Sequence, residues 1–130
     1  MQKDFDNWNK EKKNLEDVGH TELFFHEREI WWASIGINLG DEQDGKNDLY
    51  ERPVLVLRKF NRKLAWILPM STQDKKGTYY YPLKHGEKIF TIILSQLKLV
   101  SVKRFRRLIR KISPNQYSLI KRRIVDILNP

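Results

Sequence analysis

The apolar and polar positions along the chain predict a series of short β-strands between two helices. Most of the apolar runs are rich in β-branched or aromatic residues and are bounded by turn-forming residues, which is typical of strands. A turn at Asn61 and Arg62 joins the second and third runs into a hairpin. The predicted strands cover residues 30–37, 53–57, 63–70, 78–83, 88–94 and 97–102.

Both ends of the chain carry the 3.6-residue periodicity of amphipathic helices. Residues 3–18 have a thin apolar face among many Lys and Glu residues. Near the other end, Ser113 precedes Pro114 and Gln116, a pattern that predicts a helix N-terminus closed by a capping box. The sequence therefore predicts helices before and after the strands.

These elements predict a mainly β (α+β) fold. Six short strands with two flanking helices are typical of a small SH3-like barrel of strongly bent antiparallel sheet with a C-terminal helix. The chain has 130 residues, which is enough for one domain with a core of its own. Residues 1–27 are interpreted as a helical N-terminal extension with a linker, and residues 28–130 as the barrel with its C-terminal helix.

Charge is distributed unevenly along the chain. Residues 1–51 contain 6 basic and 13 acidic side chains, whereas residues 52–130 contain 19 basic and 3 acidic ones, and the net charge is +9. Such a basic half favours a polyanionic partner, with nucleic acid first and an acidic membrane surface second. A solvated surface rich in Lys and Arg is the plain alternative.

The sequence argues against several classes of site. It contains no cysteine, so disulfides and thiolate metal sites are excluded. The spacing of His20, His26 and His85 matches no metal-ligand pattern, and no P-loop, GxSxG or GxGxxG motif is present, so we expect no metal and no cofactor. There is no run of 18 apolar residues, and the N-terminus is too polar for a signal peptide. We therefore expect a cytoplasmic protein outside the membrane.

An arginine and a group of hydroxyls at predicted strand ends suit the cleavage of an RNA phosphodiester. The ribose 2′-OH is the nucleophile, and the protein has to position it, neutralise the phosphorane and transfer protons. Arg52 suits neutralisation because a guanidinium binds two phosphate oxygens and stays protonated. Ser71 and Thr72 can donate hydrogen bonds to a phosphate oxygen. A surface arginine and turn-closing hydroxyls are the plain alternatives.

Other polar segments are weaker candidates. Glu42, in an acidic loop, can orient the nucleophile or read a base edge, and an exposed carboxylate without a function is the alternative. Gln96 offers a hydrogen-bond donor and an acceptor to RNA, and hydrogen bonding to the backbone is its alternative. The basic run at residues 103–111 can bind RNA phosphates or an acidic protein tail, and plain exposed charge on a helix or turn is the alternative. The tyrosines at residues 79–81 can stack on bases, although side-chain alternation predicts that at least one lies in the core.

Five short segments, taken in order, resemble the motifs of the PemK/MazF family of toxin endoribonucleases. They are residues 28–32 (REIWW), 40–45 (GDEQDG), 52–56 (RPVLV), 68–73 (LPMSTQ) and 94–98 (LSQLK). A basic segment and a closing helix follow, as in the family, so the resemblance spans roughly residues 28–128. Each segment is short, but the ordered set is specific.

The resemblance implies a homodimer that cleaves single-stranded RNA or mRNA at short sequences without a metal and leaves a 2′,3′-cyclic phosphate. It also implies inhibition by an antitoxin protein whose acidic tail covers the RNA groove. By the same resemblance, Arg52 and Ser71 take the catalytic positions. The expected RNA-binding residues are Glu42, Gln43, Lys46, Thr72, Gln73, Gln96 and Lys98.

The chain departs from the family pattern in three places. Residues 46–51 form an insert before Arg52 that is expected to lengthen the loop over the pocket. Ser71 stands where many relatives have Thr, and Ser95 stands where some have an Asp proposed as the base, so the general base stays unassigned. The helix at residues 3–18 lies outside the common core and is expected to brace the barrel or extend the dimer.

Two other functions stay open. A related toxin with the same barrel binds DNA gyrase and is not an enzyme, although the presence of Arg52 and Ser71 speaks against that version. A plain RNA-binding module of the OB or SH3 type is the other candidate. It would bind RNA with a strongly salt-dependent affinity and produce no new RNA ends.

Overall fold

The structure is a computed structural model that describes residues 23–35 and 51–130. The predicted helix at residues 3–18 and the acidic loop up to residue 50 lie outside these residues. The described elements are β1 (Glu29–Ser34), β2 (Glu51–Lys59), β3 (Leu64–Ser71), β4 (Tyr80–His85), β5 (Lys88–Ile93), η1 (Leu94–Gln96), β6 (Lys98–Ser101), η2 (Val102–Arg104), β7 (Phe105–Lys111) and α2 (Pro114–Leu128).

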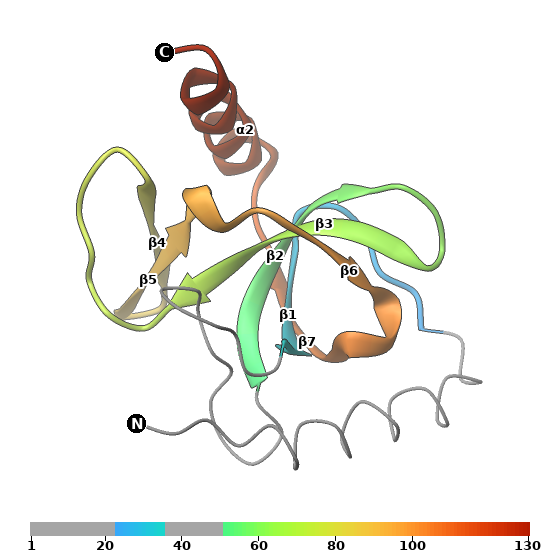
Figure 1. The fold of residues 1–130 in the computed structure, drawn as a ribbon. Helices are drawn as coiled ribbons and strands as arrows, with labels where there is room; N and C mark the ends of the chain where they lie inside the picture. Colours follow the sequence, from blue (N-terminus) through green and yellow to red (C-terminus); the bar gives the residue numbers. More distant parts are fainter. Residues whose placement is uncertain (1–22, 36–50) are drawn as a thin grey trace, which may run out of the picture.

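The described strands form one curled antiparallel sheet, and the prediction of a mainly β fold with a C-terminal helix is confirmed. The strands are ordered β4-β5-β3-β2-β1-β7, and β6 pairs with β3 beside this path. Figure 1 shows the sheet bending back on itself, with α2 standing at one end and β4 and β5 reaching out to the side. The strand β2 lies in the middle of the path, between β1 and β3.

Two hydrophobic clusters lie on opposite faces of β2. Val54 and Val56 belong to the cluster inside the curled sheet, with Phe25, Trp31, Ile67 and Phe105 among its other members. Leu55 and Leu57 belong to the second cluster, which includes Leu68, Met70, Ile92 and Ile120. A strand that is covered on both faces has a continuous apolar sequence in place of an alternating one. This double burial explains the run PVLVL at residues 53–57.

The predicted strand boundaries differ from the observed ones by one to three residues at most ends. The first strand ends at Ser34, and β4 begins only at Tyr80. The hairpin turn at Asn61 is confirmed, because its Oδ1 accepts hydrogen bonds from the amides of Lys63 and Leu64 at 2.7 and 3.0 Å. Gly86, with φ 64°, makes the turn between β4 and β5, a conformation that glycine adopts without strain.

The plain alternative for residues 103–111, exposed charge on a helix or turn, is wrong about the element. Most of this run is β7, which pairs along the free edge of β1. Phe105 holds it there, because its ring stacks on Trp31 at 5.6 Å between centroids and meets Phe25 edge-on at 5.2 Å. Arg and Lys are good helix formers, but pairing with β1 and burial of Phe105 override that preference.

The C-terminal helix begins as predicted. Ser113 is the N-cap, and its Oγ accepts a hydrogen bond from the Gln116 amide at 3.1 Å. The Gln116 side chain has a tertiary role, since its Oε1 accepts a hydrogen bond from the Tyr81 hydroxyl of β4. Burial raises the pKa of Tyr81, and the nearby Arg123 partly opposes this shift. The helix is thus fixed both at its cap and to the sheet.

We expect Ser113→Ala to lower the free energy of unfolding by about 0.5–2 kcal/mol, because the Gln116 amide loses its cap acceptor. The matched control is Ser118→Ala, which makes the same change at an exposed position inside the helix. Since Ala has a higher helix propensity than Ser, that variant should be as stable as the original or slightly more stable. Urea denaturation followed by circular dichroism measures both, and equal effects would contradict the capping role.

Candidate functional site

Arg52 lies near the start of β2 and is buried, with 9% of its surface exposed. It pairs with Ala33 of β1. On its other side β2 pairs with β3 in a register that sets Val54 opposite Pro69, and continuing this register by two residues sets Arg52 opposite Ser71. Opposite residues of an antiparallel pair project from the same face with Cβ atoms about 4.5–5.5 Å apart. The observed ladder itself ends at Val54 and Pro69, and Ser71 pairs with Thr91 of β5, so Arg52 and Ser71 stand at neighbouring ends of adjacent strands.

Ser71 is buried, and its hydroxyl takes part in the turn after β3. Its Oγ accepts a hydrogen bond from the Gln73 amide at 3.1 Å. On the neighbouring strand, the Thr91 hydroxyl donates to the Gln73 carbonyl at 2.7 Å and accepts from the Lys75 amide at 3.2 Å. Thr72 and Gln73 are exposed directly after Ser71. A hydroxyl that accepts one hydrogen bond keeps its proton to donate, so the turn orients Ser71 without using its donor.

Two other predicted RNA-binding residues lie further along the sheet. Gln96 ends η1, and Lys98 opens β6 opposite Ile67 of β3. Four residues of β3, about 13 Å of strand, separate Ile67 from Ser71. Because β6 runs antiparallel to β3, the chain before Lys98, which contains Gln96, extends toward the Ser71 end. Three predicted site residues lie outside the described part of the chain: Glu42, Gln43 and Lys46.

Glu51 is a site residue that the sequence did not reveal, and the prediction that it belongs to a loop insert is wrong. It is the first residue of β2 and is 1% exposed. Arg107 of β7 donates to both of its carboxylate oxygens, with Nη2–Oε2 and Nη1–Oε1 distances of 3.1 and 3.5 Å. A two-bond ion pair of this kind compensates a buried carboxylate. The Arg107 guanidinium also lies over the Trp32 ring, 5.6 Å from its centroid.

Two further arginines hold the end of β1 against the start of β7. Ser34, the last residue of β1, is fully buried. Nε of Arg106 donates to its Oγ at 3.0 Å, and Nη1 of Arg104 donates to its carbonyl oxygen at 3.2 Å. Arg104, Arg106, Arg107 and Arg52 therefore all lie where β1 ends and where β2 and β7 begin. This concentration of positive charge attracts a polyanion such as a nucleic acid backbone.

The arginines of β7 and Glu51 are far apart in the sequence, which is why sequence reasoning did not group them. Fifty-six positions separate Glu51 from Arg107, and β1 joins them because it pairs with both β2 and β7. The available signal was Phe105, an apolar residue within a basic run that marks the start of a strand and is itself buried. In the described residues, no three His, Asp or Glu side chains are grouped so that they could hold a metal ion.

The three tyrosines at residues 79–81 have different environments. Tyr79 precedes β4 and is 52% exposed, and the Lys75 ammonium lies 5.9 Å from the ring centroid of Tyr80. Tyr81 is partly buried and packs against the cluster that contains Ile120. The expectation that one of the three contributes to the core is therefore confirmed for Tyr81.

Comparisons with known proteins agree with this arrangement of strands. Residues 26–128 match the profile of a protein family described as PemK-like, MazF-like toxin of type II toxin-antitoxin system. A solved structure described as the crystal structure of an Mtb toxin superposes with a TM-score of 0.51 and 18% sequence identity, covering 58% of this chain and 90% of that chain. At that identity the likeness concerns the fold. Among curated protein sequences, none matches the chain. No helix in the described residues is long and apolar enough to span a membrane.

We expect Arg107→Ala to lower the free energy of unfolding by about 1–3 kcal/mol, because it leaves the buried Glu51 carboxylate without its guanidinium. The value is smaller than for a fully buried pair because 60% of the Arg107 side chain is exposed. Arg107→Ala combined with Glu51→Gln should recover part of the loss. Denaturant unfolding of the two single variants and the double variant measures the coupling, and strictly additive effects would contradict it.

Proposed function

The chain belongs to the PemK-like, MazF-like family of toxins of type II toxin–antitoxin systems, and we propose that it is the endoribonuclease of such a pair. The proposal is supported by the position of Arg52 at the start of β2 and of Ser71 at the end of β3, which are neighbouring ends of paired antiparallel strands. The proposed substrate is single-stranded RNA or mRNA, cleaved at a short sequence. The products are a 2′,3′-cyclic phosphate and a 5′-OH end.

In the proposed reaction, the ribose 2′-oxygen attacks the adjacent phosphorus, loses its proton and forms a P–O bond, while the bond to the 5′-oxygen breaks and that oxygen gains a proton. Arg52 binds the equatorial phosphate oxygens as negative charge develops there. The Ser71 hydroxyl donates to the same oxygens from its position in the β3 turn. Thr72, Gln73, Gln96 and Lys98 extend the RNA-binding surface along β3 and β6.

The Glu51–Arg107 ion pair is proposed to help position Arg52. Glu51 directly precedes Arg52 in β2, and its ion pair fixes that end of the strand against β7. A guanidinium that is held by its strand loses little freedom on binding a phosphate, which favours the transition state. The cleavage requires no metal, because the nucleophile is the hydroxyl of the substrate and Arg52 supplies the positive charge. Glu42, Gln43 and Lys46 are proposed to contact the RNA on the sequence evidence alone.

Membership of this family implies an antitoxin partner. We propose that the antitoxin carries an acidic segment that competes with RNA for the arginine-rich end of the sheet, because both are polyanions. The active form is proposed to be a homodimer in the cytoplasm. The DNA gyrase-binding toxin and the plain RNA-binding module are the alternatives that the cleavage assay separates from this proposal.

We expect Arg52→Ala to lower the cleavage rate by about 10²–10³-fold, since it removes a transition-state phosphate contact. The purified protein should cut a long mixed single-stranded RNA in the presence of EDTA, and sequencing of the 2′,3′-cyclic phosphate ends maps the cuts. The matched control is Arg122→Ala, which removes an exposed arginine of α2 and should cut at the original rate. Absence of cleavage by the original protein on many RNA sequences would overturn the proposal. Salt-dependent RNA binding without new ends would favour the binding module.

We expect Ser71→Ala to reduce cleavage by about tenfold or more and Ser71→Thr to retain most of it, because only the second variant keeps a hydroxyl at the end of β3. Single-turnover rates on the mapped RNA site distinguish the two variants. Circular dichroism melting serves as the control, since the Ser71 hydroxyl also holds the Gln73 amide. Equal rates for the two variants, with both folded, would contradict a role for the hydroxyl in the reaction.

A further inference from the structure

A pocket of about 590 Å³ lies at the end of β2 opposite to Arg52. It is lined by residues 26–28, by the tip of the β2–β3 hairpin, by Lys111 at the end of β7 and by Tyr117 in the first turn of α2. Seven residues of β2, about 23 Å of strand, separate Arg52 from Lys59 at this pocket. Its volume is in the range of small-molecule sites, about 300–1,000 Å³. The proposed cleavage site does not use it.

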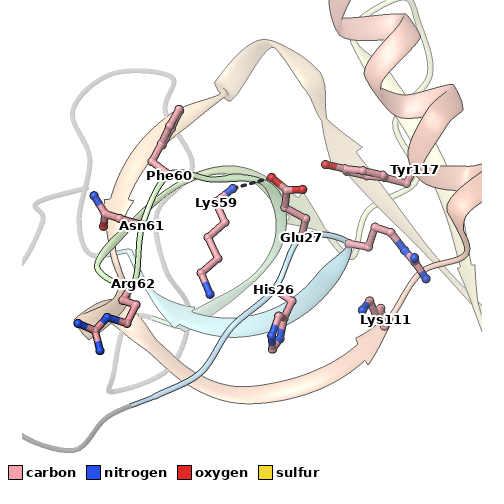
Figure 2. Close-up of a pocket in the computed structure, with 9 residues that line it drawn as sticks. His26, Glu27, Lys59, Phe60, Asn61, Arg62, Lys111 and Tyr117 are labelled. Atoms are coloured by element: carbon pink, nitrogen blue, oxygen red, sulfur yellow. Dashed lines mark hydrogen bonds between the residues drawn. The ribbon is translucent and has the colours of Figure 1, made fainter.

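Hydrogen bonds hold the walls of this pocket in place. Figure 2 shows Asn61 and Tyr117 on opposite sides, with Glu27 and Lys59 between them. The Tyr117 hydroxyl donates to the Leu57 carbonyl at 2.6 Å, and Oε2 of Glu27 accepts from the Lys59 amide at 2.9 Å. Asn61 closes the hairpin tip through its Oδ1. A ligand would therefore meet a preformed site, which lowers the entropy cost of binding.

Arg28 lines this pocket in a strained backbone conformation. Its φ is 76°, which costs a residue with a Cβ about 1–2 kcal/mol and costs glycine almost nothing. Its amide donates to the Val56 carbonyl at 3.0 Å, and its carbonyl accepts from the Ile112 amide at 2.9 Å. Its Nε donates to the Ile112 carbonyl at 3.0 Å, which uses one of five guanidinium donors. Strain of this kind concentrates at ligand sites, and four guanidinium donors of Arg28 remain for a ligand.

The pocket carries an excess of positive charge. Four of its side chains are basic, namely Arg28, Lys59, Arg62 and Lys111. Its carboxylate is Glu27, and Oε2 of that residue lies 3.7 Å from Nη1 of Arg58 just outside the pocket. The Glu27 charge is thus partly offset by a neighbour, and the basic side chains outnumber it, so an anion is the ligand that the lining favours.

An exposed aromatic ring completes the lining. Phe60 is 49% exposed, and Trp66 supports it edge-on at 5.0 Å between centroids and an interplanar angle of 89°. An aromatic ring beside several cations is the combination that binds a nucleobase and its phosphate. We propose that the pocket binds a nucleotide, with the phosphate on Arg28 and Lys111 and the base against Phe60.

The choice of a nucleotide rests on the proposed function, in which RNA is the substrate, whereas the cationic pocket is independent of it. Two ligands carry the same base and phosphate groups: a free nucleoside monophosphate and a single nucleotide unit of an RNA strand. An acidic peptide would satisfy the cations but would leave the Phe60 ring without a planar partner.

The experiment is a titration of the ¹⁵N-labelled full chain, with amide shifts recorded for five separate probes. UMP and AMP are the nucleotide probes, a 2′-O-methyl tetranucleotide is the uncleavable strand, and inorganic phosphate and a hexaglutamate peptide test simpler anions. We expect both nucleotides to shift the amides of residues 26–28 and 59–62 at lower concentration than phosphate or peptide. A tetranucleotide that binds more tightly than UMP identifies an RNA strand as the source, and weaker binding identifies a free nucleotide. Shifts confined to the Ser71 end of β3, no shifts, or equal binding of hexaglutamate would overturn the proposal.

Two variants test the assigned contacts. Arg28→Gly should raise the Kd for UMP about tenfold or more, because it removes a charged hydrogen-bond donor, while relief of the positive φ offsets the lost Nε bond and keeps the chain folded. Lys111→Ala should have a similar effect on binding without a change in melting temperature. The control is Lys88→Ala, which removes an exposed lysine of β5 and should bind UMP normally. Unchanged binding by folded Arg28→Gly overturns the site. If the protein cleaves RNA but nucleotides do not shift the amides of residues 26–28 and 59–62, the nucleotide site is wrong and the proposed function stands. If nucleotides shift these amides but no RNA is cleaved, the proposed function is wrong and the nucleotide site stands.

Discussion

The burial of β2 on both faces is the constraint on which the rest of this structure depends. Its valines pack inside the curled sheet and its leucines pack under β3, β5 and α2. A strand that is covered on both sides cannot slip by one residue without exchanging the two sets of side chains. The positions of everything attached to its ends, Arg52 at one and the hairpin tip at the other, are therefore set by the packing in its middle.

The two ends of β2 carry different chemistry, and β7 contributes to both. At the first end, Arg104 and Arg106 bond to Ser34 of β1, and Arg107 pairs with Glu51 of β2. At the other end, Lys111 adds to the pocket beside the β2–β3 hairpin. Membership of this family implies an antitoxin partner, and the proposed function adds an RNA substrate. A basic edge strand serves both needs, since RNA and an acidic protein segment compete for the same charges.

Much of the fold followed from local patterns in the sequence. The apolar runs, the turn at Asn61 and the Ser113 cap each depend on residues close together in the chain, and the structure confirms them. The adjacency of Arg52 and Ser71 was also expected, because a hairpin places the start of one strand beside the end of the next. The basic run at residues 103–111 misled the prediction, since its composition suits a helix while its partner strand lies more than 70 positions away.

The sequence by itself determined the class of this protein, the order of its motifs, and the strand ends that carry Arg52 and Ser71. These properties are encoded by periodicity and turn chemistry within short windows. Only the tertiary structure decided that Glu51 is buried against Arg107 and that Arg28, held to Ile112 across 84 positions, lines a cationic pocket with the hairpin. The physical reason is that such pairs form through the pairing of β1 with both β2 and β7, and no local pattern records which distant strands will meet.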